Sequence, residues 1–297
     1  MTLGSAATRA GVRQSATVLA PDAIGRAATL ALYDELALSP KPGLVTLTDS
    51  GSHTDMDAYT FMRSLSALRG YFVRIAALGA EDAPFEELQR CGIDAEVRML
   101  AATGGINTHR GAIFMLGLLC AAAGAAAAGR QGLDPSSLRD TLLARWGGAL
   151  EERSRRAQTL PGGIAARRHG LRSAAAEAAA GFPVLFEIAI PAMRAAQARG
   201  MSRQNELLDT LFSLIAVLDD SNLAHRGGID GLRFAQRAAR GFLAAGGASR
   251  PDGVAAARAI GDDFVSRRLS PGGAADTLAA ACWMRRLGFL APSLSEQ

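Results

Sequence analysis

The chain has 297 residues, of which 49% are hydrophobic and 20% charged, so it can bury a large core in one or two domains. Its formal charge of +4 is modest, its arginines are dispersed, and only 5% of its residues are aromatic. This composition argues against nucleic-acid binding through a basic stripe with stacking rings. Residues 1–20 carry no sustained apolar segment, so we expect a disordered tail rather than a secretory signal, followed by one domain over residues 21–297.

Helical periodicity dominates the first hundred residues. A first helix is expected to start at Pro21 and to end before the prolines at positions 40 and 42. A polar loop over 49–57 then opens a second helix that runs to Leu78. A third is predicted from Phe85 to Ala102, with an interruption near Gly92.

The segment from Gly111 to Gly129 carries no charge and is long enough to raise the question of a membrane span. Its second half is mostly alanine and glycine, which gain little from lipid, and a polar loop precedes it. We therefore predict a core helix of a soluble protein, with no membrane association.

The remaining segments also have the helical period. Asp134 followed by Pro135 is a strong helix start, and that helix is expected to run toward Arg156 with a break or bend near Gly147. Further helices are predicted around Glu177, up to Gly200 with a break near Pro191, over 207–218, after a polar loop at 219–228, up to about Leu269, and after 270–276. No alternating strand is evident, so the predicted class is all-α, a single multi-helix domain whose site lies in polar loops at helix ends.

The cysteines and the lone lysine give two smaller indications. Cys91, Cys120 and Cys282 lack metal-ligand spacing and lie in or beside apolar helices, which is typical of reduced core thiols in a cytoplasmic protein. Lys41 is the only lysine and stands between Pro40 and Pro42. A compact ammonium at this position could bind a phosphate, and chance retention is the alternative.

Two segments share the triplet His-Arg-Gly, at His109-Arg110-Gly111 and His225-Arg226-Gly227. Composition alone predicts about 0.05 such triplets in the chain, so two favour a functional site over accident. Each segment combines a guanidinium, an imidazole and an amide beside glycines that let backbone N–H groups approach a phosphate. Neighbouring polar residues share this character, whereas His169 fits an ordinary surface or core role; the neighbours are His53, Asn107, Thr108 and Asn222.

Carboxylates stand where predicted helices begin or end, at Asp55, Asp219, Asp220 and Asp276. Such groups suit a hydrated Mg²⁺ that accompanies a polyphosphate, with Asp219 and Asp220 as the candidate ligands. Neither a Walker A motif nor a G-x-G-x-x-G sequence after a strand is present. The residues therefore predict a polyphosphate pocket of another kind.

The order of these motifs resembles that of the triphosphoribosyl-dephospho-CoA synthase family. The resemblance spans roughly residues 35–281 and is carried by the segments 39–45, 51–56, 103–114, 181–183, 220–228 and 270–276. Within the family the chain is most similar to the branch associated with malonate decarboxylase rather than citrate lyase. Arg110 and Ser221 depart mildly from the family pattern, and the stretch from Arg172 to Glu177 departs more, which leaves the role of Glu177 open.

The resemblance implies that ATP and 3'-dephospho-CoA give 2'-(5''-triphosphoribosyl)-3'-dephospho-CoA with release of adenine. The product would be the precursor of the prosthetic group of an acyl carrier subunit. This glycosyl transfer should pass through an oxocarbenium-like transition state that a carboxylate stabilises while another group takes the hydroxyl proton. We hypothesise that Asp55 and Asp220 are the carboxylates and that His109 carries the proton. The triphosphate clamp would be Lys41, Arg110 and Arg226, and His53 and His225 could position either substrate.

Two other functions remain open from the sequence. An all-α metal-dependent nucleotide or ADP-ribose hydrolase also sets His and Asp on helix ends, although no His-Asp dipeptide occurs here. An alanine-rich helical interaction protein would use its polar loops only as helix caps. Adenine release that depends on dephospho-CoA separates the synthase from both.

Overall fold

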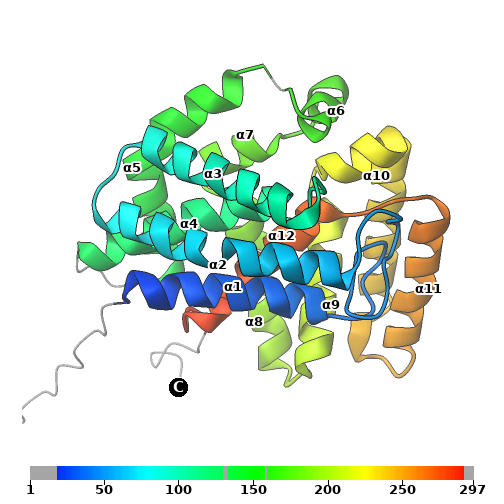
Figure 1. Ribbon diagram of the computed structural model, residues 1–297. Helices are drawn as coiled ribbons and strands as arrows, with labels where there is room; N and C mark the ends of the chain where they lie inside the picture. The colour runs from blue at the N-terminus through cyan, green and yellow to red at the C-terminus, as the bar shows by residue number, and fades with distance from the viewer. Residues whose placement is uncertain (1–18, 130–132, 158, 291–297) are drawn as a thin grey trace, which may run out of the picture.

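Helices make up all of the regular structure that is described. The computed structural model describes residues 19–129, 133–157 and 159–290, and within these ranges it contains helices and no strand (Figure 1). The predicted all-α class is therefore confirmed. The α-helices are α1 (Pro21–Ala37), α2 (Ala58–Ala80), α3 (Phe85–Thr103), α4 (Arg110–Ala128), α5 (Pro135–Arg155), α6 (Pro161–His169), α7 (Ala174–Ala179), α8 (Ile190–Ala198), α9 (Arg203–Val217), α10 (Ser221–Ala244), α11 (Gly253–Ser266) and α12 (Gly272–Arg286). A π-helical turn (Leu185–Ala189) precedes α8, and a short 3₁₀ turn (Gly247–Ser249) precedes α11.

Helix α4 is the centre of the bundle. It packs against α1, α2, α3, α5 and α12. Its most apolar stretch of 18 residues is 83% buried inside the protein. The closest approach is to α2, where a side chain at Gly79 would overlap the backbone of Ala121 and one at Gly124 would overlap the backbone of Ala76. Glycine and alanine are thus needed because the two backbones nearly touch, and the prediction of a core helix is confirmed.

The C-terminal helix α12 joins the first half of the chain to the second. It packs against α1 and α4 on one side and against α9 on the other. Trp283 of α12 is fully buried, and its indole N–H donates to the backbone carbonyl of Ile24 in α1 at 3.2 Å. The same hydrophobic cluster contains residues from both halves, so the described elements share one core.

Several predicted boundaries are correct and others are wrong. Asp134 caps α5 as expected, accepting from the backbone N–H groups of Ser136 and Ser137. Helices α3 and α5 run through Gly92 and Gly147 without interruption, because an isolated helical glycine costs only about 1 kcal/mol. The expected break near Pro191 is the π-helical turn.

The polar segment at 219–228 is not a loop. It forms the first turns of α10, which begins at Ser221 and is kinked at Gly228, where φ is 63°. His225 and Arg226 consequently project from a helix.

Other predictions concern the thiols and the chain ends. All three cysteines are free, with Cys120 and Cys282 buried and Cys91 half-buried, as expected for reduced core thiols. The predicted tail over residues 1–20 lies almost entirely outside the described residues, and its disorder stays a prediction.

Candidate functional site

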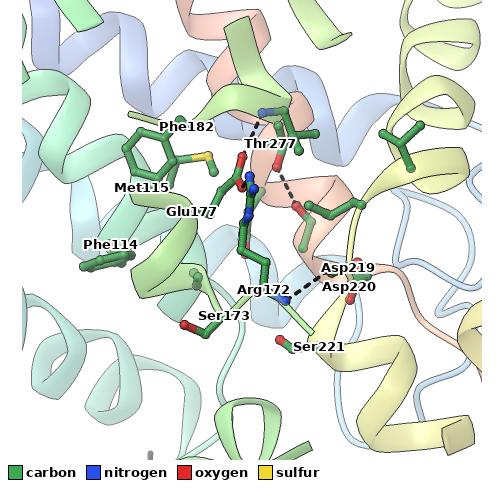
Figure 2. Close-up of a pocket in the computed structure, with 17 residues that line it drawn as sticks. Phe114, Met115, Arg172, Ser173, Glu177, Phe182, Asp219, Asp220, Ser221 and Thr277 are labelled. Carbon is green, nitrogen blue, oxygen red and sulfur yellow. Dashed lines mark hydrogen bonds and ion pairs between the residues drawn. The ribbon is translucent and has the colours of Figure 1, made fainter. Parts of the chain in front are cut away.

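A pocket of about 230 Å³ opens where the N-termini of three helices meet (Figure 2). Gly111 of α4, Ser221 of α10 and Gly273 of α12 all line it. Side chains from the α6–α7 connection and from α7 form the opposite wall, among them Arg172 and Glu177. The partial positive charge of a helix N-terminus attracts anions, and here the carboxyl groups of Asp220 and Asp276 already accept several of the terminal N–H groups.

Asp220 holds two of these N-termini together. It is fully buried, and its Oδ1 accepts from the backbone N–H groups of Asn222 at 2.9 Å and Leu223 at 3.2 Å, which caps α10. Its Oδ2 accepts from the backbone N–H of Ala274 in α12 at 3.0 Å. Burial raises the pKa of the Asp220 carboxyl, while these backbone donors oppose the rise.

Asp276, one turn into α12, faces the same pocket and is partly accessible through it. The backbone N–H of Ala112 donates to its carboxyl group. Its Oδ2 lies so close to Gly111 that any side chain there would overlap it. Burial in the protein, together with the negative charges of Glu35 and Asp220, raises the pKa of Asp276 well above its usual range.

Behind the pocket lies a buried ion pair between Glu35 and Lys41. The Lys41 Nζ donates to Glu35 Oε1 at 2.5 Å and to the Glu35 backbone carbonyl at 2.7 Å. The two side chains are only 1% and 6% exposed. Burial lowers the pKa of Lys41 and raises that of Glu35, and their mutual attraction opposes both shifts. Lys41 thus lies beneath the pocket and does not line it.

Arg172 extends from Asp219 to Glu177 among the residues that line the pocket, as Figure 2 shows. Its backbone N–H donates to Asp219 Oδ2 at 3.0 Å, and its guanidinium donates to Glu177 Oε2 at 3.1 Å. Glu177 Oε1 accepts from the backbone N–H of Val184 at 2.7 Å, so this buried carboxylate ties α7 to the π-helical turn's N-terminal side. A role for Glu177 as a wall of the pocket follows from these contacts.

His109 is buried beside the pocket, with its ring edge-on to Phe61 at 4.9 Å. Its Nδ1 shares a hydrogen bond of 2.7 Å with Ser64 Oγ, and its Nε2 has no partner within the described part of the chain. Burial and the charge of Lys41 lower the pKa of His109 to about 3. The imidazole is therefore neutral at physiological pH.

The neighbours of His109 point elsewhere. The Arg110 guanidinium contacts Glu96 of α3 through Nε at 2.7 Å and Nη2 at 2.6 Å. Asn107 accepts the backbone N–H of Arg110, and Thr108 Oγ1 is buried with no partner among the described residues. The imidazole of His109 thus lies in the core, whereas the guanidinium of Arg110 pairs with Glu96 on α3.

A second group of predicted residues forms around His53. Arg226 Nη2 donates to His53 Nδ1 at 3.0 Å and Nη1 donates to the Ser52 carbonyl at 3.1 Å. Because arginine only donates, His53 Nε2 carries the proton and donates to Ser270 Oγ at 2.9 Å. Asp55 Oδ1 lies 3.7 Å from His53 Nδ1, and burial followed by the charge of Arg226 lowers the pKa of His53.

The two His-Arg-Gly segments therefore do not form one paired clamp around the pocket. Among the predicted site residues, Asp219 and Asp220 line it, whereas His225 lines a separate cavity between α6 and α10. Asn222 lies next to Gly272 at the start of α12. The remaining predicted residues line neither cavity; they are Lys41, His53, Asp55, Asn107, Thr108, His109, Arg110 and Arg226.

The carboxylates at the pocket fit Mg²⁺ only in part. Within the described ranges, no three ligating side chains come together as a metal site. Both oxygens of Asp220 accept from backbone N–H groups, an arrangement that fits a helix cap better than a metal ligand. Asp219 uses only Oδ2, for Arg172, and so keeps one oxygen for a cation bound mainly by phosphates and water.

Sequence reasoning missed Arg172 and Glu35 as parts of the site and gave Asp276 no role of its own. Glu35 is visible as an acidic residue on the otherwise apolar face of the first helix, six residues before the only lysine. Asp276 stands in a Pro-Gly-Gly helix start, where a cap is the ordinary interpretation. Only the packing of α12 on α4 reveals that its carboxyl group lies near those of Glu35 and Asp220.

Known proteins match this chain over nearly its whole length. The family model described as ATP:dephospho-CoA triphosphoribosyl transferase matches residues 21–292. A protein of Azotobacter vinelandii named probable 2-(5''-triphosphoribosyl)-3'-dephosphocoenzyme-A synthase is 41% identical over 283 residues, covering 92% of this chain and 94% of the relative. Proteins of the same name are 36% identical in Acinetobacter calcoaceticus, covering 88% of this chain and 89% of the relative, and 37% identical in Vibrio cholerae serotype O1, covering 91% and 89%.

A search of the solved structures gives no significant match. The family match extends through every α-helix of the described residues, and the pocket at the three helix N-termini lies within it. The chain therefore belongs to the ATP:dephospho-CoA triphosphoribosyl transferase family.

Proposed function

We propose that this protein transfers the triphosphoribosyl group of ATP to the 2'-hydroxyl of 3'-dephospho-CoA and releases adenine. Family membership supports the two substrates. The observation that carries the proposal is the pocket itself, in which three helix N-termini stand beside the carboxyl groups of Asp219 and Asp276. The N-termini suit a phosphate chain, and the carboxyl groups suit a ribose that becomes positively charged.

The reaction breaks the bond between the ribose anomeric carbon and the adenine nitrogen and forms one to the acceptor oxygen. The hydroxyl loses a proton and adenine gains one, so the protein has to handle both transfers. We assign the donation to Asp276. Glu35 is compensated by Lys41 and Asp220 by three backbone N–H groups, whereas Asp276 has a single backbone donor, no cation and a raised pKa. Its raised pKa and its position on the pocket wall are why we choose it as the proton donor to adenine.

The roles assigned from the sequence are kept as proposals. Asp220 would stabilise the oxocarbenium-like transition state from the pocket wall, as Asp55 would from the His53 loop. His109 stays the proposed acceptor of the hydroxyl proton because its Nε2 has no partner among the described residues, and bound substrate would have to raise its pKa from about 3 for it to act as a base. The residues proposed from the sequence to bind the triphosphate do not line the pocket, and His53 and His225 among them could position either substrate; they are His53, Asn107, Thr108, Arg110, Asn222, His225 and Arg226.

Mg²⁺ is proposed to enter with ATP. Asp219 would contact the ion directly or through water, because it has an oxygen free at the pocket. The ion would neutralise phosphate charge and hold the chain of phosphates in place while adenine leaves.

The biological setting is proposed from the sequence resemblance. The product would supply the prosthetic group of the acyl carrier subunit of malonate decarboxylase, in the cytoplasm. Deleting the gene and weighing the carrier subunits of malonate decarboxylase and citrate lyase by mass spectrometry tests this branch. A citrate lyase carrier that loses its prosthetic group while the malonate decarboxylase carrier keeps it would contradict the assignment.

The direct test of the reaction is adenine release. The full-length protein is incubated with ATP, Mg²⁺ and 3'-dephospho-CoA, and adenine is quantified by liquid chromatography while the product is identified by mass. We expect one adenine for each product molecule and none when dephospho-CoA is omitted. Breakdown of ATP without the acceptor would favour a hydrolase, and no turnover by a protein that is folded by circular dichroism would favour an interaction protein.

A further inference from the structure

A second cavity, of about 470 Å³, lies between α6 and α10. These helices pack against each other, and Figure 1 shows α6 beside the start of α10. Pro161, Ile164, Arg168 and His169 line the cavity from α6, and His225 and Gly228 line it from α10.

The polar side of this cavity consists of hydrogen-bond donors, one of which, Arg168, is a cation. Arg168, His169 and His225 line it, and no carboxylate is among the lining residues. Within the part of the chain that the structure describes, no hydrogen bond or ion pair engages the side chain of any of these three. Arg110 and Arg226, by contrast, already contact Glu96 and His53. The cavity therefore offers uncommitted donors to an anion, and an Arg with two imidazoles suits a diphosphate.

The other side of the cavity is apolar. Pro161 and Ile164 form it, and Ile164 is 53% exposed although it is a large aliphatic residue. A phosphate alone would leave this surface in water. A ligand with a diphosphate and a long, largely uncharged arm would cover both sides.

The two cavities meet at one contact. Gly162 follows Pro161 of the second cavity, and a Cβ atom built on Gly162 would lie 2.9 Å from Ser221 Oγ, which lines the first pocket. Along α10, Ser221 faces the first pocket and His225, one turn later, faces the second. Only this contact between Gly162 and Ser221 separates the two cavities along α10.

The size of the first pocket requires such an arrangement. Pockets that enclose one drug-sized ligand usually measure roughly 300 to 1,000 Å³. The first pocket, at about 230 Å³, cannot hold two nucleotides. It can hold the reacting ribose and a neighbouring group, while the rest of the second substrate lies elsewhere.

We propose that the α6–α10 cavity binds the diphosphate and the pantetheine arm of 3'-dephospho-CoA, so that the acceptor 2'-hydroxyl reaches the pocket beside Ser221. This inference rests on the proposed function and adds the location of the acceptor. The reacting ribose of ATP and the group next to it then lie in the first pocket, and the two nucleotides meet at the contact between α6 and α10.

The test compares two neighbouring arginines. Arg168→Glu reverses a charge inside the cavity, and Arg167→Glu reverses an exposed charge on the same turn of α6 that does not line it. Binding of 3'-dephospho-CoA and of ATP to the full-length proteins is measured separately by calorimetry. We expect Arg168→Glu to weaken dephospho-CoA binding about 10- to 100-fold and to leave ATP binding unchanged. Arg167→Glu, as the matched control, should change dephospho-CoA affinity by less than about threefold.

Two further variants keep the test decisive. Arg168→Gln removes the charge without reversing it and should give a smaller loss in the same direction. Ile164→Glu places a negative charge on the apolar wall and should also weaken dephospho-CoA binding. Unchanged dephospho-CoA affinity in Arg168→Glu, or a loss of ATP affinity instead, overturns the location. If the wild-type protein neither binds dephospho-CoA nor releases adenine, the proposed function fails as well, and the two failures are thereby distinguished.

Discussion

Replacing Lys41 by methionine separates the sequence interpretation of this residue from its structural environment. The sequence predicts a phosphate ligand, whereas the structure pairs the ammonium with Glu35 in the core. The substitution keeps the length and much of the volume of the side chain and removes its charge. We expect its main effect to be on stability.

The magnitude follows from the burial of both partners. Removing one member of a buried ion pair costs about 3 to 5 kcal/mol, because the other charge remains without a partner in a poorly hydrated place. The substitution also removes the Lys41 Nζ hydrogen bond to the Glu35 backbone carbonyl, which keeps the backbone N–H of Leu38 as a donor. Protonation of Glu35, whose pKa burial already raises, limits the loss, so we expect about 3 kcal/mol for Lys41→Met alone.

The double variant Glu35→Leu with Lys41→Met is the matched control. A buried ion pair replaced by apolar side chains of similar size is often neutral or stabilising. We therefore expect the double variant to recover most of the lost unfolding free energy, measured by urea denaturation followed by circular dichroism. Its affinity for ATP should stay within about twofold of wild type.

The opposite result would refute this reasoning. If Lys41→Met leaves the free energy of unfolding unchanged and the double variant binds ATP at least about 10-fold more weakly, Lys41 acts on a phosphate. The buried pair would then be a resting arrangement that ATP displaces, and the sequence interpretation would hold.

Three other predictions concern the pocket and its surroundings. Gly111→Ala should push the Asp276 carboxylate from its place and reduce kcat at least about 10-fold, whereas Gly148→Ala, with nothing near its Cβ, should leave kcat unchanged; equal effects would contradict the role of Asp276. His109 has a pKa lowered from 6.5 to about 3, so folding keeps it neutral and the protein loses stability as the pH falls below 6.5. Between pH 6.5 and 5 this loss is about 2 kcal/mol, and urea denaturation of His109→Gln should show a correspondingly weaker pH dependence; identical profiles would contradict the burial argument. Arg110→Ala should chiefly weaken ATP binding measured by calorimetry. An unchanged ATP affinity would refute the proposed contact between Arg110 and the triphosphate.

The helices and their core were predictable because their signals are local. The apolar run of α4, the Asp134-Pro135 start of α5 and the proline-terminated end of α1 each depend on residues within one or two turns. The predictions that failed, at Gly92 and 219–228, concern breaks, and of the break or bend predicted near Gly147 the break is excluded. A glycine costs too little to interrupt a helix that packs well, and a capping aspartate turns a polar segment into a helix start.

The site was predictable in its residue types and less so in their partners. Asp219 and Asp220 line the pocket, and the polar segments that carry them lie at helix ends as expected. The arginines of the two His-Arg-Gly triplets lie apart, because a neighbouring helix supplies Glu96 to one and a distant loop supplies His53 to the other. Such partners are separated by 14 residues in the first case and 173 in the second, far beyond any local pattern.

The sequence by itself determined that the chain is helical, that α4 is its core and that polar residues gather where helices begin. Only the tertiary structure decided which of those beginnings face one another. Packing α12 on α4 through Gly111 brings Asp276 near Glu35 and Asp220, and burial together with these negative charges raises its pKa well above its usual range. Helical periodicity acts over a few residues, whereas the pKa of a carboxyl group depends on every charge within several ångströms, whatever its position in the chain.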